Sequence, residues 1–357
     1  MSRGSVDPDV GVSLCRADPD SGLLMRVLDA QQIRSWREQG FVVVDDLFAA
    51  DLLERTIADA DEVFPAGGSP EAEAWNDFGS SHQMEFPADS AGLNEMTLHP
   101  RLLTAVTELL RVGVRELRLT QSEVWPKYGR AGRSGAERDN DDQRIHVDYP
   151  NHTLVHPPPW DSPEAVEIFV YLSEFEQSGG ATAVVPRTGP DDPAYAWPIV
   201  GTPGVGALPW LNDRISAEAY LEREAPDIAG WRATHLYPRE VPVHFGVGTV
   251  LFYRHDTWHR GTPLRPGTRR LAQNLTFRKA GSEWVSTRQP GWARAMYRRS
   301  QVMEHLVARA SVDQRCVLGF PAPGHAYWTP ETLAAVDARY GPLGMDAAPY
   351  VNALRSG

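Results

Sequence analysis

A histidine and an aspartate lie two positions apart in the short stretch RIHVDY, at His146 and Asp148. Alternate residues of a β-strand project from the same face, so both side chains would point the same way if the stretch is extended. An imidazole beside a carboxylate can begin a metal site or form half of an acid/base pair. The same two side chains can also form nothing more than a solvated strand edge, so other residues must decide.

Two more histidines, His255 and His259, lie in the stretch RHDTWHRGT after a strongly apolar segment. Two histidines and one carboxylate on one side of a metal leave up to three positions open, which suits ferrous iron that must also bind a cosubstrate and O2. Zinc more often takes a further nitrogen or sulfur ligand and closes to four ligands. Arg270, eleven residues beyond His259, offers a planar fork of donors for a carboxylate.

Three motifs, in this order along the chain, resemble the phytanoyl-CoA dioxygenase family of Fe(II)- and 2-oxoglutarate-dependent oxygenases. They are HVD at 146–148, GGATAVVPRTG at 179–189 and WHRGTPLRPGTRR at 258–270. The resemblance runs from the first predicted helix to about residue 280. It departs from the family where PRTG replaces the usual PGSH, and where the asparagine often found after the distal histidine is missing.

The resemblance implies a set of iron ligands and a grip for the cosubstrate. By position, the iron ligands would be His146, Asp148 and His259. Arg270 matches the family's arginine that pairs with the distal carboxylate of 2-oxoglutarate. Related halogenases carry a small residue in place of the carboxylate ligand. Because this chain keeps Asp148, hydroxylation or another two-electron oxidation is favoured over halogenation.

Further residues are candidates for the same site. His255 is an alternative metal ligand, although His259 fits the family spacing to Arg270 better. Arg269 competes with Arg270, because only one of two adjacent strand residues can point inward. The candidates for additional cosubstrate contacts, which could equally make local hydrogen bonds, are Gln143, Thr182 and Lys127. The aromatic candidates for a substrate pocket, which could equally belong to a β-core, are Trp125, Tyr149, Trp160 and Trp258.

The elements that must position these residues are visible in the sequence pattern. Asp29 and Gln32 form a capping-box pattern at the start of a first helix, which Gly40 ends. Further helices are predicted over 50–63, 99–112, 216–224, 292–310 and 330–341. Strands are predicted over 41–48, 114–125, 145–149, 166–173, 181–186, 239–245, 248–254 and 269–278.

This succession predicts a mainly β fold with flanking helices, built on a double-stranded β-helix core of the jelly-roll, cupin-like type. Residues 1–27 are expected to form an irregular tail, and residues 28–357 a single oxygenase domain with its core at about 114–280. Two long polar connections, about 129–142 and 187–238, are expected to act as lids. C-terminal helices at about 292–341 complete the domain.

The composition is that of a soluble globular protein, with 42% hydrophobic residues and a mean hydropathy of −0.38. No apolar run approaches the roughly 18 residues of a spanning helix, and the first residues lack the apolar core of a signal peptide. Two cysteines are too few for a disulfide framework, so we expect a cytoplasmic protein without a membrane partner. The net charge of −12 argues against nucleic acid as a partner. We expect a small-molecule substrate and a monomer or homodimer.

The sequence therefore predicts a dioxygenase that uses Fe(II), 2-oxoglutarate and O2 to hydroxylate or otherwise oxidise a C–H bond of a small molecule. A natural-product intermediate or an amino-acid or nucleoside derivative would suit it. An acyl-CoA thioester is less favoured, because its phosphates prefer a basic rim. Two other classes stay open. One is a Zn- or Mn-dependent cupin-type isomerase, lyase or hydrolase, which would not need Arg270. The other is a non-catalytic jelly roll that binds a small molecule.

Overall fold

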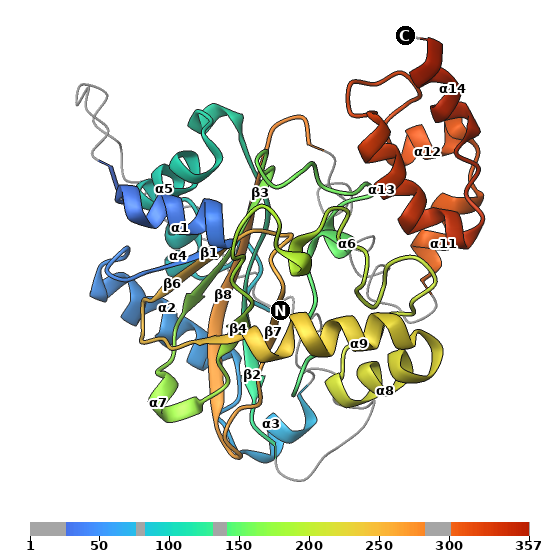
Figure 1. Ribbon diagram of the computed structural model, residues 1–357. Helices are drawn as coiled ribbons and strands as arrows, with labels where there is room; N and C mark the ends of the chain where they lie inside the picture. Colours follow the sequence, from blue (N-terminus) through green and yellow to red (C-terminus); the bar gives the residue numbers. More distant parts are fainter. Residues whose placement is uncertain (1–25, 76–82, 131–140, 283–300, 357) are drawn as a thin grey trace, which may run out of the picture.

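The computed structural model describes residues 26–75, 83–130, 141–282 and 301–356, and at its centre are two antiparallel sheets (Figure 1). The larger sheet has five strands in the order β1-β6-β3-β8-β2, and the smaller has three in the order β5-β4-β7. The strands are β1 (Phe41–Val44), β2 (Leu117–Tyr128), β3 (Ala165–Tyr171), β4 (Thr182–Val184), β5 (Val241–Val243), β6 (Val250–Tyr253), β7 (His259–Gly261) and β8 (Arg269–Lys279).

Helices precede, interrupt and follow the strands. They are α1 (Ala30–Gln39), α2 (Ala50–Val63), α3 (Pro70–Ala74), α4 (Ala91–Thr97), α5 (Pro100–Leu110), α6 (Tyr149–His152), α7 (Phe175–Ser178), α8 (Arg214–Glu224), α9 (Pro226–His235), α11 (Val302–Arg309), α12 (Val312–Leu318), α13 (Pro330–Tyr340) and α14 (Ala348–Ser356). In the part of the chain that the structure describes, no helix combines the length and the hydrophobicity needed to cross a bilayer.

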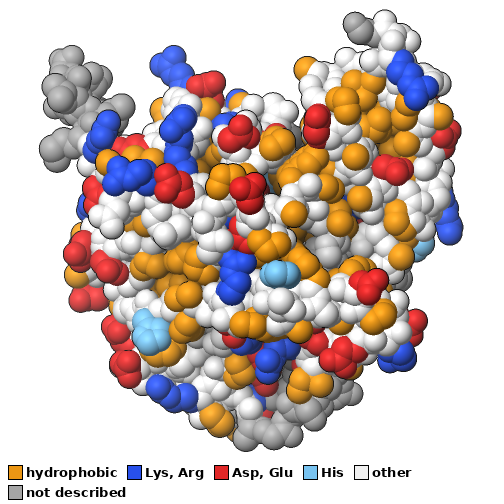
Figure 2. All heavy atoms as spheres, viewed as in Figure 1, with side chains coloured by type: hydrophobic (Ala, Val, Ile, Leu, Met, Phe, Trp, Pro, Cys, Tyr) orange, Lys and Arg blue, Asp and Glu red, His pale blue; other side chains and the backbone are white. Residues whose placement is uncertain are grey.

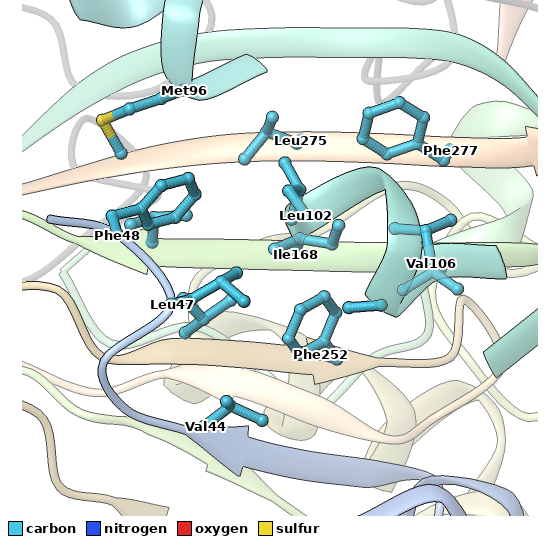
Figure 3. Packing of buried hydrophobic residues seen from close by; sticks show 14 of the residues in the cluster. Val44, Leu47, Phe48, Met96, Leu102, Val106, Ile168, Phe252, Leu275 and Phe277 are labelled. Carbon is cyan, nitrogen blue, oxygen red and sulfur yellow. The ribbon is translucent and has the colours of Figure 1, made fainter. Parts of the chain in front are cut away.

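The alternation of side chains along the strands separates the two faces of the five-stranded sheet. On β3, Ile168 and its alternate neighbours belong to the core under the N-terminal helices, while Phe169 and Tyr171 face the smaller sheet. Figure 3 shows Leu102 and Val106 of α5 packed over Ile168 and its neighbours from β6 and β8. One face of the large sheet thus packs against the N-terminal helices, and the other face lines the space between the two sheets.

The first helix is confirmed as predicted. The Asp29 side chain accepts hydrogen bonds from the backbone of the first turn, and Gln32 closes the capping box. Gly40 ends the helix with a φ of 97°, a left-handed conformation that favours glycine. The predicted helices over 50–63, 99–112, 216–224 and 330–341 also form, with end points shifted by up to two residues.

Two expectations are corrected, and some elements were not predicted. The fold is not mainly β, because helical residues outnumber strand residues among those described. The predicted strand over 145–149 is absent. It is replaced by an isolated bridge at His146 and by the start of α6. The strand β7 and the helices α4 and α9 were not predicted, because β7 and α4 are too short for a clear pattern and α9 carries no clear apolar stripe.

Parts of the predicted organisation lie outside the described residues. These parts are residues 1–25 of the expected tail, 131–140 of the first expected lid and 292–300 of an expected helix. The second expected lid, 187–238, is described, and it contains α8 and α9. On the face of the molecule shown in Figure 2, basic and acidic side chains are interspersed and form no continuous basic stripe.

The four C-terminal helices lie to one side of the sheets (Figure 1) and share a hydrophobic core of their own. Leu154 and Val155, which follow α6, pack into this core. The buried guanidinium of Arg339 on α13 donates hydrogen bonds to the carbonyl oxygens of Pro150 (2.9 Å) and Thr153 (2.8 Å). The C-terminal helices are therefore anchored to the segment that begins at α6.

We predict that Ile168→Ala lowers the free energy of unfolding by about 2–5 kcal/mol, because it leaves a cavity in the packed core under α5. Ile215→Ala is the matched control, since Ile215 is 67% exposed on α8 and its loss should cost roughly 0.5 kcal/mol or less. Urea unfolding followed by circular dichroism measures both. Equal destabilisation by the two variants would contradict the assignment of the core.

Candidate active site

Two distant segments of the chain are joined at His146 and His259 by a reciprocal pair of backbone hydrogen bonds. The N–H of each residue donates to the carbonyl oxygen of the other, at 2.8 Å in both directions. Residues paired in this way present their side chains on the same face. The two imidazole rings therefore lie together, with their centroids 4.4 Å apart.

Asp148 completes this group by a route that differs from the predicted strand. Its backbone has helical dihedral angles (φ −89°, ψ −21°), and its N–H donates to the carbonyl oxygen of His255 at 2.9 Å. The turn brings Asp148 Oδ1 to 3.5 Å from Nε2 of His146 and Oδ2 to 3.3 Å from Nε2 of His259. The three ligand atoms lie within 4.8 Å of one another, which is close enough to bind a single metal ion.

The backbone also decides which nitrogen of each histidine faces the carboxylate. Nδ1 of His146 lies 3.1 Å from the carbonyl oxygen of Arg144, and Nδ1 of His259 lies 2.9 Å from that of Thr257. A carbonyl oxygen only accepts hydrogen bonds, so the Nδ1 atoms carry the protons. The lone pairs of both Nε2 atoms therefore point toward Asp148, as metal-binding histidines require.

Electrostatics favour the metal-binding protonation states. Burial lowers the pKa of His146 to about 3, so its imidazole is neutral at physiological pH. Burial alone would raise the pKa of the Asp148 carboxyl, but its electrostatic interactions with the neighbouring His259 and His146 outweigh burial and hold the pKa below its usual range. The hydroxyl of Tyr253 donates to Asp148 Oδ2 at 2.9 Å and further favours the carboxylate.

His255 is placed outside this group. Its backbone carbonyl accepts the N–H groups of Asp148 and Tyr149, so it shapes the turn at the site. Among the described residues, the one cluster of histidine and carboxylate groups with metal-binding geometry is the set of His146, Asp148 and His259. The structure therefore brings together the three residues that the family spacing favoured, and the alternative ligand His255 is not among them.

Two buried cations mark one end of the cavity that contains the three residues. Arg270 on β8 and Lys127 on β2 are register partners, and both line the cavity. The Arg270 guanidinium lies over the ring of Tyr171, 5.7 Å from its centroid, and donates to the carbonyl oxygen of Gly180. Nζ of Lys127 donates to the carbonyl oxygen of Thr262 at 2.7 Å.

Gln143 and Thr182 lie at the same end of the cavity. Oε1 of Gln143 accepts the N–H of Gly261 at 2.8 Å, and Gly261 is the register partner of Thr182. A Cβ atom on Gly261 would lie 2.8 Å from Gln143 Oε1 and 3.2 Å from Lys127 Nζ, so the absent side chain permits this close approach. The structure thus gathers the four predicted cosubstrate residues around one end of the cavity.

Arg269 points the other way, as the alternation along β8 requires. Its guanidinium donates to the carbonyl oxygen of Phe64 at 2.7 Å and pairs with Asp61 on α2. It does not line the cavity. Of the two adjacent arginines, Arg270 is therefore the one that faces the candidate metal ligands.

The aromatic candidates separate into one cavity residue and three core residues. Trp125 lines the cavity and is the register partner of Ala272 on β8. The others do not line it, and their polar atoms bond to backbone carbonyls: Tyr149 donates to Ile199, Trp160 to Arg37 and Trp258 to Ala194. These three pack in or against one hydrophobic cluster beside the cavity.

Several cavity residues were not predicted. They are Gln121, Asn151, His152, Glu167, Phe169, Trp210, Asn212, Tyr253 and Asn274. Two of them carried a signal in the sequence: Glu167 is a charged residue inside the apolar strand AVEIFVY, and Tyr253 occupies the inward phase of β6. Trp210 and Asn212 come from the 187–238 connection, so part of this long segment lines the cavity.

We predict that His259→Ala weakens binding of Mn(II), a redox-stable stand-in for Fe(II), by more than about a hundredfold. A direct ligand should cost at least as much as the roughly 10- to 100-fold loss seen for groups that only support a ligand. His255→Ala should leave the affinity close to that of the wild type. The electron paramagnetic resonance signal of free Mn(II) measures both. Loss of binding in the His255 variant alone would reverse the assignment.

Comparisons with known proteins agree with the motifs. The family model described as phytanoyl-CoA dioxygenase (PhyH) matches residues 36–272. No protein with a curated function matches the chain in sequence.

Three solved structures are similar to this chain. EvdO2 from Micromonospora carbonacea var. aurantiaca, complexed with 2-oxoglutarate, shares 15% identity over 72% of this chain and 93% of its own, with a TM-score of 0.48. The epimerase SnoN, in complex with Fe3+, alpha ketoglutarate and nogalamycin RO, shares 16% identity over 71% and 84%, with a TM-score of 0.47. HygX from Streptomyces hygroscopicus, with nickel and 2-oxoglutarate bound, shares 17% identity over 72% and 90%, with a TM-score of 0.44.

The family model covers well over half of the chain and includes all three candidate metal ligands. The protein therefore belongs to the phytanoyl-CoA dioxygenase (PhyH) family.

Proposed function

We propose that the protein is an Fe(II)- and 2-oxoglutarate-dependent oxygenase that oxidises a C–H bond of a small molecule. The observation that carries this proposal is the convergence of His146, Asp148 and His259 within 4.8 Å, in a cavity that also contains the buried Arg270. Two imidazoles and one carboxylate are a donor set that suits Fe(II) and leaves positions open for other ligands. Membership of the PhyH family supports the same activity.

The arrangement of the sheets supports the finer description of the fold. We infer that the two facing antiparallel sheets form a double-stranded β-helix, with the candidate ligands on β7 and on the segment that is bridged to it. The C-terminal helices, anchored through Arg339, would belong to the same domain. We further propose a cytoplasmic enzyme, a monomer or homodimer, whose partner is its substrate. The low cysteine count supports the compartment, and the net charge of −12 supports a small molecule over nucleic acid as the partner.

The residues of this chain divide the work of the proposed site. Fe(II), with 2-oxoglutarate and O2, would supply the oxidising power that breaks a substrate C–H bond. The two Nε2 atoms and the Asp148 carboxylate would hold the ion, while the carbonyls of Arg144 and Thr257 keep the rings from rotating. Arg270 would grip the distal carboxylate of 2-oxoglutarate. Lys127 would add positive charge beside it.

The chemistry at Asp148 supports hydroxylation or another two-electron oxidation. The carboxylate occupies a position that a halide would need, and Tyr253 fixes it with a hydrogen bond of 2.9 Å. A metal ion held by these residues would therefore have fewer exchangeable coordination positions than one in a halogenating enzyme.

We predict that the wild-type protein with Fe(II), 2-oxoglutarate and O2 forms succinate as it consumes oxygen, even slowly without a substrate. Asp148→Ala should abolish this turnover, because the ion loses its one anionic ligand. Asp337→Ala, at an exposed position of α13, is the matched control and should retain it. An oxygen electrode and chromatography of the products provide the measurement. Unchanged turnover in the Asp148 variant would refute the ligand assignment, and Zn(II)-supported activity without 2-oxoglutarate would indicate a Lewis-acid enzyme instead.

We also predict that Arg270→Lys weakens binding of 2-oxoglutarate by roughly tenfold or more, since a point charge cannot reproduce a two-pronged grip worth about 1.5–3 kcal/mol. Arg269→Lys is the matched control, because Arg269 pairs with Asp61 on the opposite face of the strand. Calorimetric titration with 2-oxoglutarate compares the two. A larger effect of the Arg269 variant would move the cosubstrate grip to that residue.

A further inference from the structure

The cavity extends along the inner face of β8, away from its cationic end. Arg270, Ala272 and Asn274 line it in alternation, and Thr276 follows as the register partner of Glu167 on β3. At about 3.3 Å per residue, the six steps from Arg270 to Thr276 cover roughly 20 Å. Glu167, at the level of Thr276, thus marks a second end of the cavity, far from the residues proposed to bind 2-oxoglutarate.

Helix α6 delivers two polar side chains to this second end. The turn that begins at Asp148 places Asn151 and His152 in the cavity wall, and the Asn151 N–H donates to the Asp148 carbonyl at 3.0 Å. Asn151 is only 2% exposed, and its Oδ1 accepts no hydrogen bond from any residue that the structure describes. A buried amide without a partner is rare in folded proteins. Its hydrogen-bonding capacity is therefore open to a ligand in the cavity.

The neighbouring carboxylate, in contrast, is already occupied. Glu167 Oε1 lies 3.1 Å from Nδ1 of His152, and the Thr276 hydroxyl donates to Oε2. Both oxygens have donors, and the charge has a partner. Glu167 is thus not an open site for an ammonium group.

The charges of the lining disfavour anions here as well. Among the described residues that line the cavity, the only lysine and arginine are Lys127 and Arg270, and both belong to the opposite end. What the second end offers are amides, from Asn151 and from the half-buried Asn274, whose side chain bonds to no described residue. Such a lining suits neutral groups that both donate and accept hydrogen bonds. Hydroxyl groups have both properties.

Two aromatic rings line the cavity at the positions of Ala272 and Asn274. Trp125 lies across from Ala272, and Phe169 across from Asn274, and both rings line the cavity. An aromatic ring can cover the C–H face of a saturated ring while amides bind its hydroxyl groups. A saturated ring held there would place its C–H bonds within the cavity that the candidate metal ligands line.

We propose that Asn151 and Asn274 form a subsite for the hydroxyl groups of a neutral polyhydroxylated ring, such as a cyclitol or a sugar, which the enzyme oxidises. This substrate class rests on the proposed oxygenase function. Asn151 would act as a specificity-determining residue, since it follows the metal ligand Asp148 by three positions and so couples recognition of the ring to the position of the metal.

The test is saturation-transfer NMR on the full chain loaded with diamagnetic Zn(II) and 2-oxoglutarate. The neutral probes are myo-inositol and methyl α-D-glucoside, and the charged probes are cyclohexylammonium and cyclohexanecarboxylate. We expect transfer to at least one neutral probe and a weaker signal from the charged ones. Asn151→Leu should weaken binding of that probe by about fivefold or more, the loss expected for one hydrogen bond. Asn274→Leu is a second, independent variant. Asn352→Leu, exposed on α14, is the matched control and should bind as the wild type does.

Several outcomes would overturn the proposal. They are no transfer to either neutral probe, unchanged binding in both the Asn151 and Asn274 variants, or preference for a charged probe. Calorimetric binding of 2-oxoglutarate by each variant shows that it is folded, so loss of probe binding cannot be mistaken for loss of structure. If the wild-type protein binds 2-oxoglutarate but no polyol, only the proposed substrate class is wrong. If the wild-type protein does not bind 2-oxoglutarate, the proposed oxygenase function is wrong.

Discussion

The whole site depends on two backbone hydrogen bonds, those exchanged by His146 and His259 at 2.8 Å. They join β7 to a segment that forms no regular strand, and so they place two imidazoles from distant parts of the chain on one face. The Nδ1 contacts are also made to backbone carbonyls, each two residues before its histidine. Main-chain geometry therefore sets both the position and the tautomer of the rings. Side-chain packing has only to exclude water around them, which the burial of both residues achieves.

The cavity built on this frame is polarised along β8. Arg270 and Lys127 concentrate positive charge at one end, and amides and a paired carboxylate form the other. A dianionic cosubstrate and a neutral substrate would be separated by this contrast alone. The C-terminal helices contribute indirectly, because Arg339 binds the carbonyl oxygen of Pro150 within α6, the helix that carries Asn151. Helices that lie to one side of the sheets (Figure 1) thus help to fix the second end of the cavity.

Sequence reasoning predicted what local chemistry determines. The capping box at Asp29 follows from local geometry. Strand alternation predicted that only one of Arg269 and Arg270 faces inward, and the family resemblance favoured Arg270. The strand over 145–149 was wrong because the turn at Asp148 is held by the carbonyl oxygen of His255, a contact over more than a hundred residues. The sequence did not separate Tyr149 and Trp258 from the cavity residue Trp125, because a buried aromatic side chain has the same sequence signature in a core as in a pocket. Asn151 was missed as a cavity residue because α6, which carries it into the cavity wall, begins where the sequence predicted a strand.

The most direct test of the central claim, that these three residues hold one Fe(II) ion with room for 2-oxoglutarate beside it, is an anaerobic spectroscopic titration. The protein is loaded with one equivalent of Fe(II), and 2-oxoglutarate is added while the visible absorption is recorded. A chelating keto acid on Fe(II) produces a metal-to-ligand charge-transfer band. We predict that this band grows and saturates at one equivalent of 2-oxoglutarate. A protein that binds Fe(II) but develops no such band would contradict it, because the open coordination positions would then be absent.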